Sequence, residues 1–131
     1  MKYVCLVYVD PAKVAALTPA EMEFLDEASI ANDEELRRSG HLIVAQALEP
    51  VSTATTVRVR NGRLSATDGP FAETNEQLGG FMFIEARDLN EAIDIAGRAP
   101  VTKIASMEVR PALDLLGRVQ ARRAARAAGA S

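Results

Sequence analysis

The chain has 131 residues, 48% of them hydrophobic and 25% charged, and a formal net charge of −3. This length suits one domain with a sizeable core, and the acidic balance disfavours nucleic acid as the main partner. No apolar run approaches the roughly 20 residues of a membrane span, and the apolar N-terminal stretch is too short for a signal peptide. A single cysteine excludes an intrachain disulfide and favours a cytoplasmic protein.

The first predicted element is a strand over residues 2–9 that is apolar on both faces. Alternation places Val4, Leu6 and Tyr8 on one face, and Tyr3, Cys5, Val7 and Val9 on the other. A strand of this kind is expected to be buried on both sides. Cys5 is therefore expected to serve as inert packing.

A helix is predicted to begin after Thr18, which acts as the N-cap, with Pro19 at the first helical position and Glu21 completing a capping box. It runs to about Arg38 and ends at Ser39-Gly40. One stripe at helical spacing holds Met22, Leu25, Ser29, Asn32 and Leu36. Its two polar members, Ser29 and Asn32, are expected at a rim position, and a polar cleft is the alternative.

The rest of the core is predicted to hold three more strands, a hairpin and a second helix. His41 precedes a strand over residues 42–48. Asn61-Gly62 is the strongest short hairpin signal, and it joins alternating runs over residues 55–60 and 63–67. Strands are also predicted over residues 80–86 and 104–110, with a helix between them from a capping box at Asp88 and Glu91 to about Arg98.

This order, β-α-β-hairpin-β-α-β, predicts an α+β fold: a ferredoxin-like βαββαβ sandwich with an inserted β-hairpin. Two helices can cover only one face of a four-stranded sheet, yet the first strand is apolar on both faces. A second subunit that lays its sheet against this one would cover the other face. The sequence therefore predicts a homodimer.

Residues 113–131 form an alanine- and arginine-rich tail, with a helix predicted over residues 113–130. From residue 114 onward, four arginines and one aspartate give a charge of +3, so the rest of the chain carries −6. The favoured interpretation is a solvated helix that docks through Leu115, Leu116 and Val119. Binding of nucleic acid or of an acidic partner is the alternative.

The segment after the hairpin is the most distinctive part of the chain. Asp68-Gly69-Pro70 combines an Asx-type acceptor, a residue free to adopt a positive φ and a residue with a fixed φ, which is typical of a turn. Gly79-Gly80 is a second flexible point before the next strand. Loops placed in this way between strands often carry function. From these residues alone, however, the favoured interpretation is a tight connector with a solvated polar tip.

The run from Asp68 to Thr74, which reads DGPFAET, and its continuation QLGGF strongly resemble the DGPF-motif members of the YCII-related (YciI-like) family. The runs over residues 54–62, 85–92 and 107–111 resemble that family's hairpin, second helix start and last strand. The likeness covers roughly residues 1–112, which are expected to form one domain. The tail, residues 113–131, lies outside it.

The resemblance implies a ferredoxin-like fold that pairs into a dimeric α/β barrel, with a cleft near the motif. It also implies a catalytic histidine–aspartate pair, for which the candidates here are Asp68 and His41, the only histidine. The family's histidine lies in the first helix, where this chain has Met22-Glu23-Phe24-Leu25. The ligand-binding candidates are Asp68, Gly69, Pro70, Phe71, Glu73 and Thr74.

Two classes of function stay open. The first is a small-molecule-binding or regulatory module, which the resemblance associates with extracytoplasmic-function sigma factors. The second is a cofactor-independent enzyme that uses His41 and Asp68 as an acid–base pair on a small organic substrate. The sequence holds no phosphate-binding glycine loop, nucleophile elbow or metal-ligand cluster, so neither a cofactor nor a metal is expected.

Overall fold

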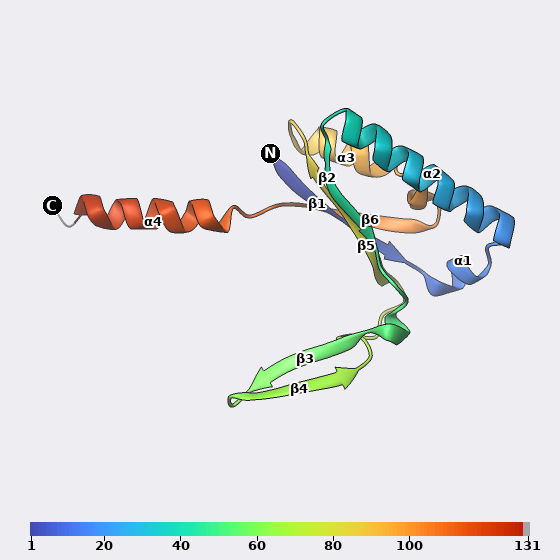
Figure 1. Cartoon of the computed structure of the whole chain (residues 1–131), viewed down its shortest axis with the longest axis horizontal. Coiled ribbons are helices and arrows are strands. Elements are labelled where there is room, and N and C mark those ends of the chain that lie inside the picture. The colour runs from blue at the N-terminus through green and yellow to red at the C-terminus, as the bar shows by residue number, and fades with distance from the viewer. Residues whose placement is uncertain (130–131) are drawn as a thin grey trace.

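The structure, a computed structural model, describes residues 1–129 and has the predicted order of elements (Figure 1). A short helix and two 3₁₀ turns, which the sequence analysis did not predict, lie in the connections. The elements are β1 (Lys2–Val9), α1 (Pro11–Ala15), α2 (Pro19–Arg38), β2 (Leu42–Ala47), η1 (Val51–Thr53), β3 (Thr55–Arg60), β4 (Arg63–Asp68), β5 (Gln77–Glu85), α3 (Leu89–Arg98), η2 (Pro100–Lys103), β6 (Ala105–Pro111) and α4 (Leu115–Gly129).

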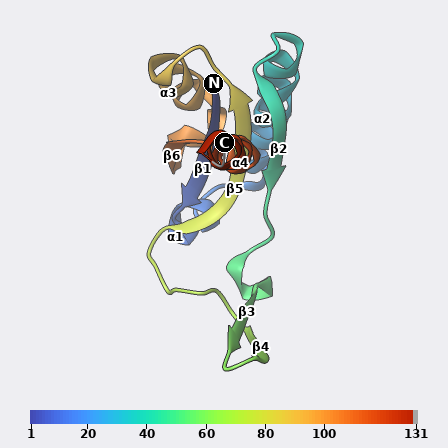
Figure 2. The same cartoon turned by 90° about the vertical axis from the view of Figure 1, so that its left-hand side faces the viewer.

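Four strands form one antiparallel sheet in the order β2-β5-β1-β6, and β3 and β4 form a separate hairpin. Helices α2 and α3 lie on one side of the four-stranded sheet (Figures 1 and 2). The two central strands are therefore β1 and β5, in agreement with the apolar pattern of the first strand. The predicted α+β ferredoxin-like fold with an inserted hairpin is confirmed.

The core lies between the sheet and α3. Its buried side chains are Tyr3, Cys5 and Val7 from β1, Met82 and Ile84 from β5, and Ala92, Ile95 and Ala96 from α3. Cys5 is 0% exposed, and its burial raises the pKa of the thiol to about 11. The thiol therefore stays protonated at neutral pH and acts as packing, as predicted.

The opposite face of the sheet is apolar, and none of the helices within residues 1–129 covers it (Figure 2). The strand register pairs Val4 with Phe83 and Leu6 with Phe81, and all four residues are half-buried. Val44 on β2 pairs with Phe83 and is exposed. We call the surface formed by these five residues the open face; Figure 2 looks onto it. It is the face that the sequence predicts to need a cover.

Local capping residues define both long helices. The Glu21 amide donates to the Thr18 hydroxyl, and the Thr18 amide donates to the Glu21 carboxylate, so the predicted capping box of α2 is complete. In α3 the Glu91 amide donates to the Asp88 carboxylate. The Glu91 side chain instead accepts from the Arg87 amide, so only half of that predicted capping box forms.

Gly79 and Gly80 lie inside β5 and are not a flexible point before it, as the sequence analysis expected. The register of β5 against β1 shifts between Val7 and Tyr8, which leaves Gly79 in a β-bulge. A Cβ atom on Gly80 would lie 2.8 Å from the Gln46 carbonyl oxygen. Gly80 therefore allows close approach of the β5 backbone to the edge strand β2, whereas a Cβ atom on Gly79 would meet the Val9 side chain at 3.0 Å.

The β3–β4 hairpin and α4 extend away from the sheet, and both lie on the side opposite to α2 (Figure 1). The hairpin turn has positive φ at Asn61 (54°) and Gly62 (74°), the pattern of a type I′ turn. The tail is helical, but docking of this helix on its own chain is not observed, since Leu115 and Leu116 are exposed. The last predicted helical residue, 130, lies outside the described residues.

Candidate functional site

The predicted ligand-binding loop begins at the base of the hairpin. Asp68 is the last residue of β4 and is exposed. The Gly69 amide donates to the Ala54 carbonyl at 2.8 Å, the Thr56 hydroxyl donates to the Gly69 carbonyl at 2.8 Å, and the φ of Gly69 is 105°. Within residues 1–129 no hydrogen bond reaches the Asp68 carboxylate, so the expected Asx acceptor role is not seen.

The rest of this loop is also exposed. The Phe71 ring is 77% exposed, and the Arg58 guanidinium lies 5.4 Å from its centroid. Pro70, Glu73 and Thr74 are exposed as well. The Phe71 ring and the Arg58 guanidinium together give the loop an exposed aromatic and cationic surface.

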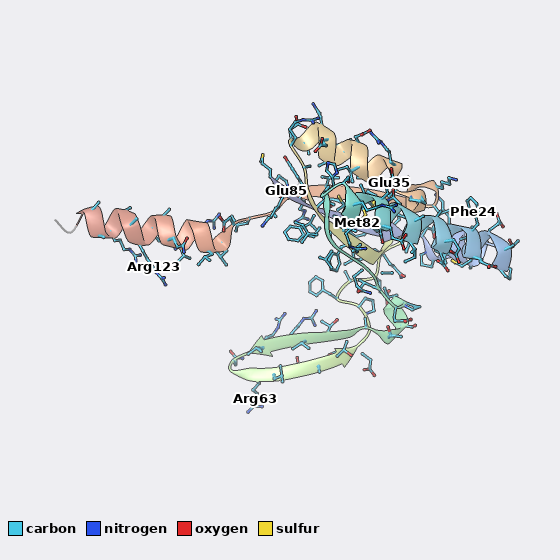
Figure 3. All side chains as sticks on the ribbon, turned by 45° about the horizontal axis from the view of Figure 1, so that its top comes forward. Phe24, Glu35, Arg63, Met82, Glu85 and Arg123 are labelled. Carbon is cyan, nitrogen blue, oxygen red and sulfur yellow. The ribbon has the colours of Figure 1, made fainter. Side chains whose placement is uncertain are left out.

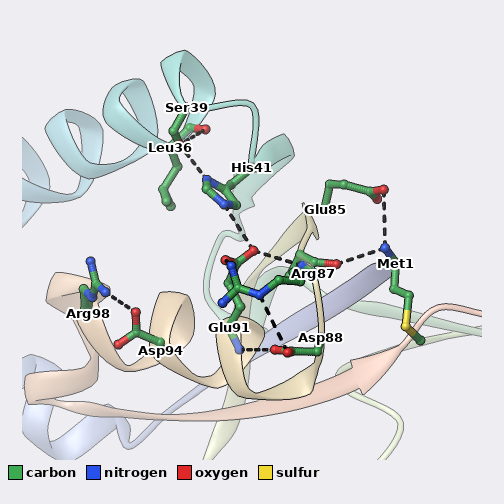
Figure 4. A network of polar contacts seen from close by, with 11 residues as sticks. Met1, Leu36, Ser39, His41, Glu85, Arg87, Asp88, Glu91, Asp94 and Arg98 are labelled. Carbon is green, nitrogen blue, oxygen red and sulfur yellow. Dashed lines mark hydrogen bonds and ion pairs between the residues drawn. The ribbon is translucent and has the colours of Figure 1, made fainter.

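His41 lies at the other end of the sheet, directly before β2 (Figure 4). Its Nδ1 is 2.7 Å from the Ser39 hydroxyl oxygen, and its Nε2 is 3.3 Å from the Glu91 Oε1. The Arg87 guanidinium contacts the other Glu91 oxygen at 2.9 Å. The hydrogen bond from the Arg87 amide, with smaller contributions from the Arg87 and His41 charges, holds the pKa of Glu91 below its ordinary value.

His41 and Asp68 do not come together within one chain. The His41 carbonyl accepts from the Glu85 amide at one end of the β2–β5 pair, whereas Leu48 donates to the Gly79 carbonyl at the other end. The six residues of β2 between them span roughly 20 Å. The histidine is instead paired with Glu91, which the sequence analysis did not single out. A catalytic role of either residue stays a prediction.

A cavity of about 470 Å³ lies between α2 and the sheet, and we call it the α2 cavity. Helix α2 lines it with the polar residues Asp26, Ser29, Asn32 and Asp33, and the sheet lines it with residues that include Val7, Met82 and Met107. Backbone at Gly79 and Gly80 also borders it, next to the β-bulge. Its size is within the roughly 300–1,000 Å³ of small-molecule pockets.

The polar wall of the α2 cavity stands where an ordinary helix would place apolar side chains. Ser29 and Asn32 lie on the half-buried stripe of α2, together with Leu25. Within residues 1–129 the side chains of Ser29 and Asn32 make no hydrogen bond. Of the two positions that the sequence leaves open for them, the structure therefore favours the polar cleft. Their hydrogen-bonding groups are available to a ligand.

Asp33 is the member of this wall that sequence reasoning missed. Burial raises the pKa of its carboxyl above the ordinary value, and the positive charge of Arg37 partly opposes the shift. A carboxyl with a raised pKa in a cavity is a candidate for binding or proton transfer. Asp33 lies four residues after Ser29, a spacing that places both on the same side of the helix. Nothing else in the local sequence distinguishes Asp33 from the exposed acidic residues of α2.

A second hollow, of about 490 Å³, lies on the open face and is largely apolar. Among residues 1–129 no group of three histidine, cysteine or acidic side chains could hold a metal ion. In the same part of the chain, none of the helices has the length and apolarity that a membrane crossing requires. The α2 cavity is therefore the site whose lining combines apolar surface with free polar groups.

Comparisons with known proteins place the chain in a family. An uncharacterised protein of Rhizobium meliloti (strain 1021) is 36% identical over 115 residues, which cover 85% of this chain and 91% of that protein. The fold is similar to that of 5-chloro-2-hydroxyhydroquinone dehydrochlorinase (TftG) from Burkholderia phenoliruptrix AC1100, solved in complex with 2,5-dihydroxybenzoquinone. That match has a TM-score of 0.52 at 16% identity and covers 86% of this chain and 94% of TftG. Residues 1–115 match the model of the YCII-related domain, and this protein therefore belongs to the YCII-related family.

Proposed function

We propose that this protein binds a small organic molecule in the α2 cavity. The observation that carries the proposal is the pair Ser29 and Asn32: two polar side chains on the sheet-facing stripe of a helix, bordering a cavity, with no hydrogen bond within the described residues. Both side chains are half-buried, so their hydrogen-bonding groups are open to the cavity and to a molecule that enters it. A ligand with matching polar groups along one edge would hydrogen-bond to this wall.

The lining defines the chemistry of the ligand. Apolar side chains such as Val7, Met82 and Met107 favour a flat or apolar body, and the α2 wall favours hydroxyl, carbonyl or amino groups along one edge. TftG, a protein of similar fold, was solved with 2,5-dihydroxybenzoquinone, a small ring that carries oxygens of this kind. That compound and a set of hydroxy- and amino-substituted benzenes are therefore suitable first probes.

A ligand screen with two matched variants tests the proposal. At saturation, at least one probe should raise the thermal midpoint of the wild-type protein by several degrees, because binding to the native state stabilises it. Ser29→Leu fills the cavity and should abolish the shift. Ala31→Leu adds the same side chain on the exposed side of α2 and should leave the shift intact. A shift that survives Ser29→Leu would place the ligand elsewhere.

Acid–base catalysis without a cofactor is the second candidate. Asp33 favours it, since burial raises the pKa of this carboxyl above its ordinary value at the wall of the cavity, which makes it a better proton acceptor than an exposed aspartate. A catalytic role of His41 and Asp68 stays a prediction. For the two residues to act as a pair, a different conformation or a second chain would have to bring them close. Turnover of a probe that falls in Asp33→Asn but not in Asp68→Asn would assign the proton transfer to the cavity.

We further propose that the protein is a cytoplasmic homodimer in which two open faces pack against each other. The apolar and half-exposed side chains Leu6, Phe81 and Phe83 support this packing. The predicted regulatory role beside a sigma factor belongs to the same proposal, with the exposed α4 as the segment that such a partner would contact. Co-purification of the sigma factor with the full chain, and its loss on deletion of α4, would test that role.

A further inference from the structure

Two arms project on the same side of the sheet. One is the β3–β4 hairpin with its following loop, and the other is α4. Figures 1 and 2 show both on the side of the open face, at different ends of the sheet, with α2 and α3 on the other side. The open face therefore forms the floor of a space that has an arm at each end.

The hairpin arm has an apolar surface that is exposed in the part of the chain that the structure describes. Its register places Val57 opposite Ala66 and Val59 opposite Leu64, and Leu64 is 72% exposed. The opposite face of the hairpin carries Arg58 with its cross-strand partner Ser65, and Arg60 with its partner Arg63. A two-stranded hairpin alone is marginally stable in water, so an arm of this kind needs a surface to pack on.

The α4 arm has the same need. It is a single helix of fifteen residues, and isolated helices of that length are marginal in water. Leu113, Leu115 and Leu116 are each at least 60% exposed near its start. The Gly117 amide donates to the Asp114 carboxylate at 2.9 Å, which caps the first turn but adds no packing.

We propose that the occupant of this space is a second copy of the chain, clasped between the two arms. The proposal rests on the homodimer proposed above and adds that the dimer is held by exchanged arms as well as by the sheets. The apolar surfaces of the hairpin and of the start of α4 then pack on the flanks of the partner. Each arm is ordered by the contact that it makes.

Charge favours a second copy over other occupants. The hairpin, residues 55–68, has three arginines and one aspartate, and α4 has four arginines and no acid. Helix α2 has seven acidic residues and two arginines. Figure 3 marks Arg63 and Arg123 on the arms and Glu35 on α2. The cationic arms of one chain thus complement the acidic helix layer of another.

The arms are long enough for this contact. Six-residue strands give the hairpin a length of roughly 20 Å, and fifteen helical residues give α4 about 22 Å. Two packed sheets are about 10 Å apart. Both arms therefore extend past the sheet of a second copy and reach the level of its helices.

Photo-crosslinking in the full chain tests the clasp. A benzoylphenylalanine at Leu64 or at Leu116 should give a covalent dimer, with the adduct mapped to residues of the other copy. The same group at Asp94, on the exposed side of α3, is the matched control and should give none. Light scattering on the same samples reports separately whether a dimer exists.

Two variants measure the contribution of the arms. Val57→Thr with Val59→Thr and Leu64→Thr keeps strand-forming residues but removes the apolar surface, and it should weaken dimerisation roughly tenfold or more. Arg122→Glu with Arg123→Glu should weaken it similarly, whereas Lys13→Glu on α1 should not.

The outcomes separate the two proposals. A wild-type dimer with no crosslink from either arm, or with unchanged affinity in the arm variants, overturns the clasp and leaves the sheet-to-sheet dimer standing. A monomeric wild-type protein overturns both. Crosslinks from the arms to co-purified nucleic acid, in place of a second copy, also overturn the clasp.

Discussion

His41 and Glu91, which are 50 positions apart in the sequence, join the start of β2 to α3. The distance between His41 Nε2 and Glu91 Oε1 is 3.3 Å (Figure 4). The same carboxylate accepts from the Arg87 amide at 2.9 Å. The start of β2 and the first turn of α3 are therefore tied through one side chain. This arrangement explains the position of the only histidine without a catalytic role.

The first prediction concerns the charge of Glu91. Because the native state holds the pKa of this carboxyl below its ordinary value of 4.5, the stabilisation is fully present above pH 4.5 and is lost as the pH falls through the lowered value. Glu91→Gln keeps an acceptor for the Arg87 amide but removes the charge. Its thermal midpoint should lie below that of the wild type at pH 7, and the gap should close in acid.

Thermal denaturation across a pH series measures this effect. Glu49→Gln, at an exposed carboxylate after β2 that makes no hydrogen bond within residues 1–129, is the matched control and should show no gap that depends on pH. A constant gap between Glu91→Gln and the wild type down to pH 3 would mean that shape, and not charge, is what the His41 and Arg87 contacts require.

The second prediction has the opposite sign and concerns Asp33. Burial raises the pKa of this carboxyl above its ordinary value of 3.8, so ionisation costs stability as the pH rises through that range. Asp33→Asn removes the cost. The variant should be at least as stable as the wild type at pH 7 and indistinguishable from it well below pH 3.8, while ligand binding in the α2 cavity weakens.

Denaturant melts at both pH values, combined with the probe titration, provide the measurement. Destabilisation of Asp33→Asn at neutral pH would show that the carboxylate makes a native contact that outweighs its burial. In that case Asp33 would be a structural residue and would not be free to meet a ligand.

Local signals predicted the helix and turn boundaries well. Thr18 and Glu21 lie three residues apart and their capping box depends on nothing else, and Asn61-Gly62 requires only the backbone of its own hairpin. The pairing of His41 with Glu91 could not be predicted from local sequence, because Glu91 belongs to a different element. Asp68, for which the motif suggested that partnership, lies at the far end of the sheet.

The third prediction concerns Gly80, whose role depends on the neighbouring strand. Gly80→Ala would place a Cβ atom 2.8 Å from the Gln46 carbonyl oxygen, on backbone that cannot move without breaking the β2–β5 pairing. The loss of unfolding free energy should be about 1–3 kcal/mol, as for overpacking in a core. Equilibrium denaturation in urea would measure it.

Gly97→Ala is the matched control for this prediction. Gly97 lies within α3, and a Cβ atom there would meet nothing within 4 Å. Alanine is the better helix former, so the control should be stabilised by about 0.5–1 kcal/mol. Equal loss of stability in both variants would contradict the close approach at Gly80.

The fourth prediction concerns Asp68. Since this side chain is exposed and makes no hydrogen bond within residues 1–129, Asp68→Asn should change the free energy of unfolding by less than about 1 kcal/mol. Binding in the α2 cavity should be unchanged. A roughly tenfold loss of ligand affinity at constant stability would support the predicted ligand-binding loop instead, because one charge-assisted hydrogen bond is worth about 1.5–3 kcal/mol.

The α2 cavity was only partly predictable. The polar members of the stripe, Ser29 and Asn32, are visible in the sequence, but a rim position and a cleft produce the same pattern. The distinction depends on what lies below them, and that floor comes from β1, β5 and β6, which are distant in the chain. Asp33 became a candidate site residue only because the structure shows it partly buried at the wall of the cavity.

Amide chemical-shift mapping with the hydroxylated and amino-substituted benzenes, 2,5-dihydroxybenzoquinone included, is the decisive test of ligand binding in the α2 cavity. Binding in the α2 cavity should shift the amides of residues 25–33 on α2 and 79–82 on β5 most strongly, and Ser29→Leu should remove those shifts. Largest shifts in residues 68–76, or no saturable shift with any of these probes, would show that the α2 cavity is not the binding site.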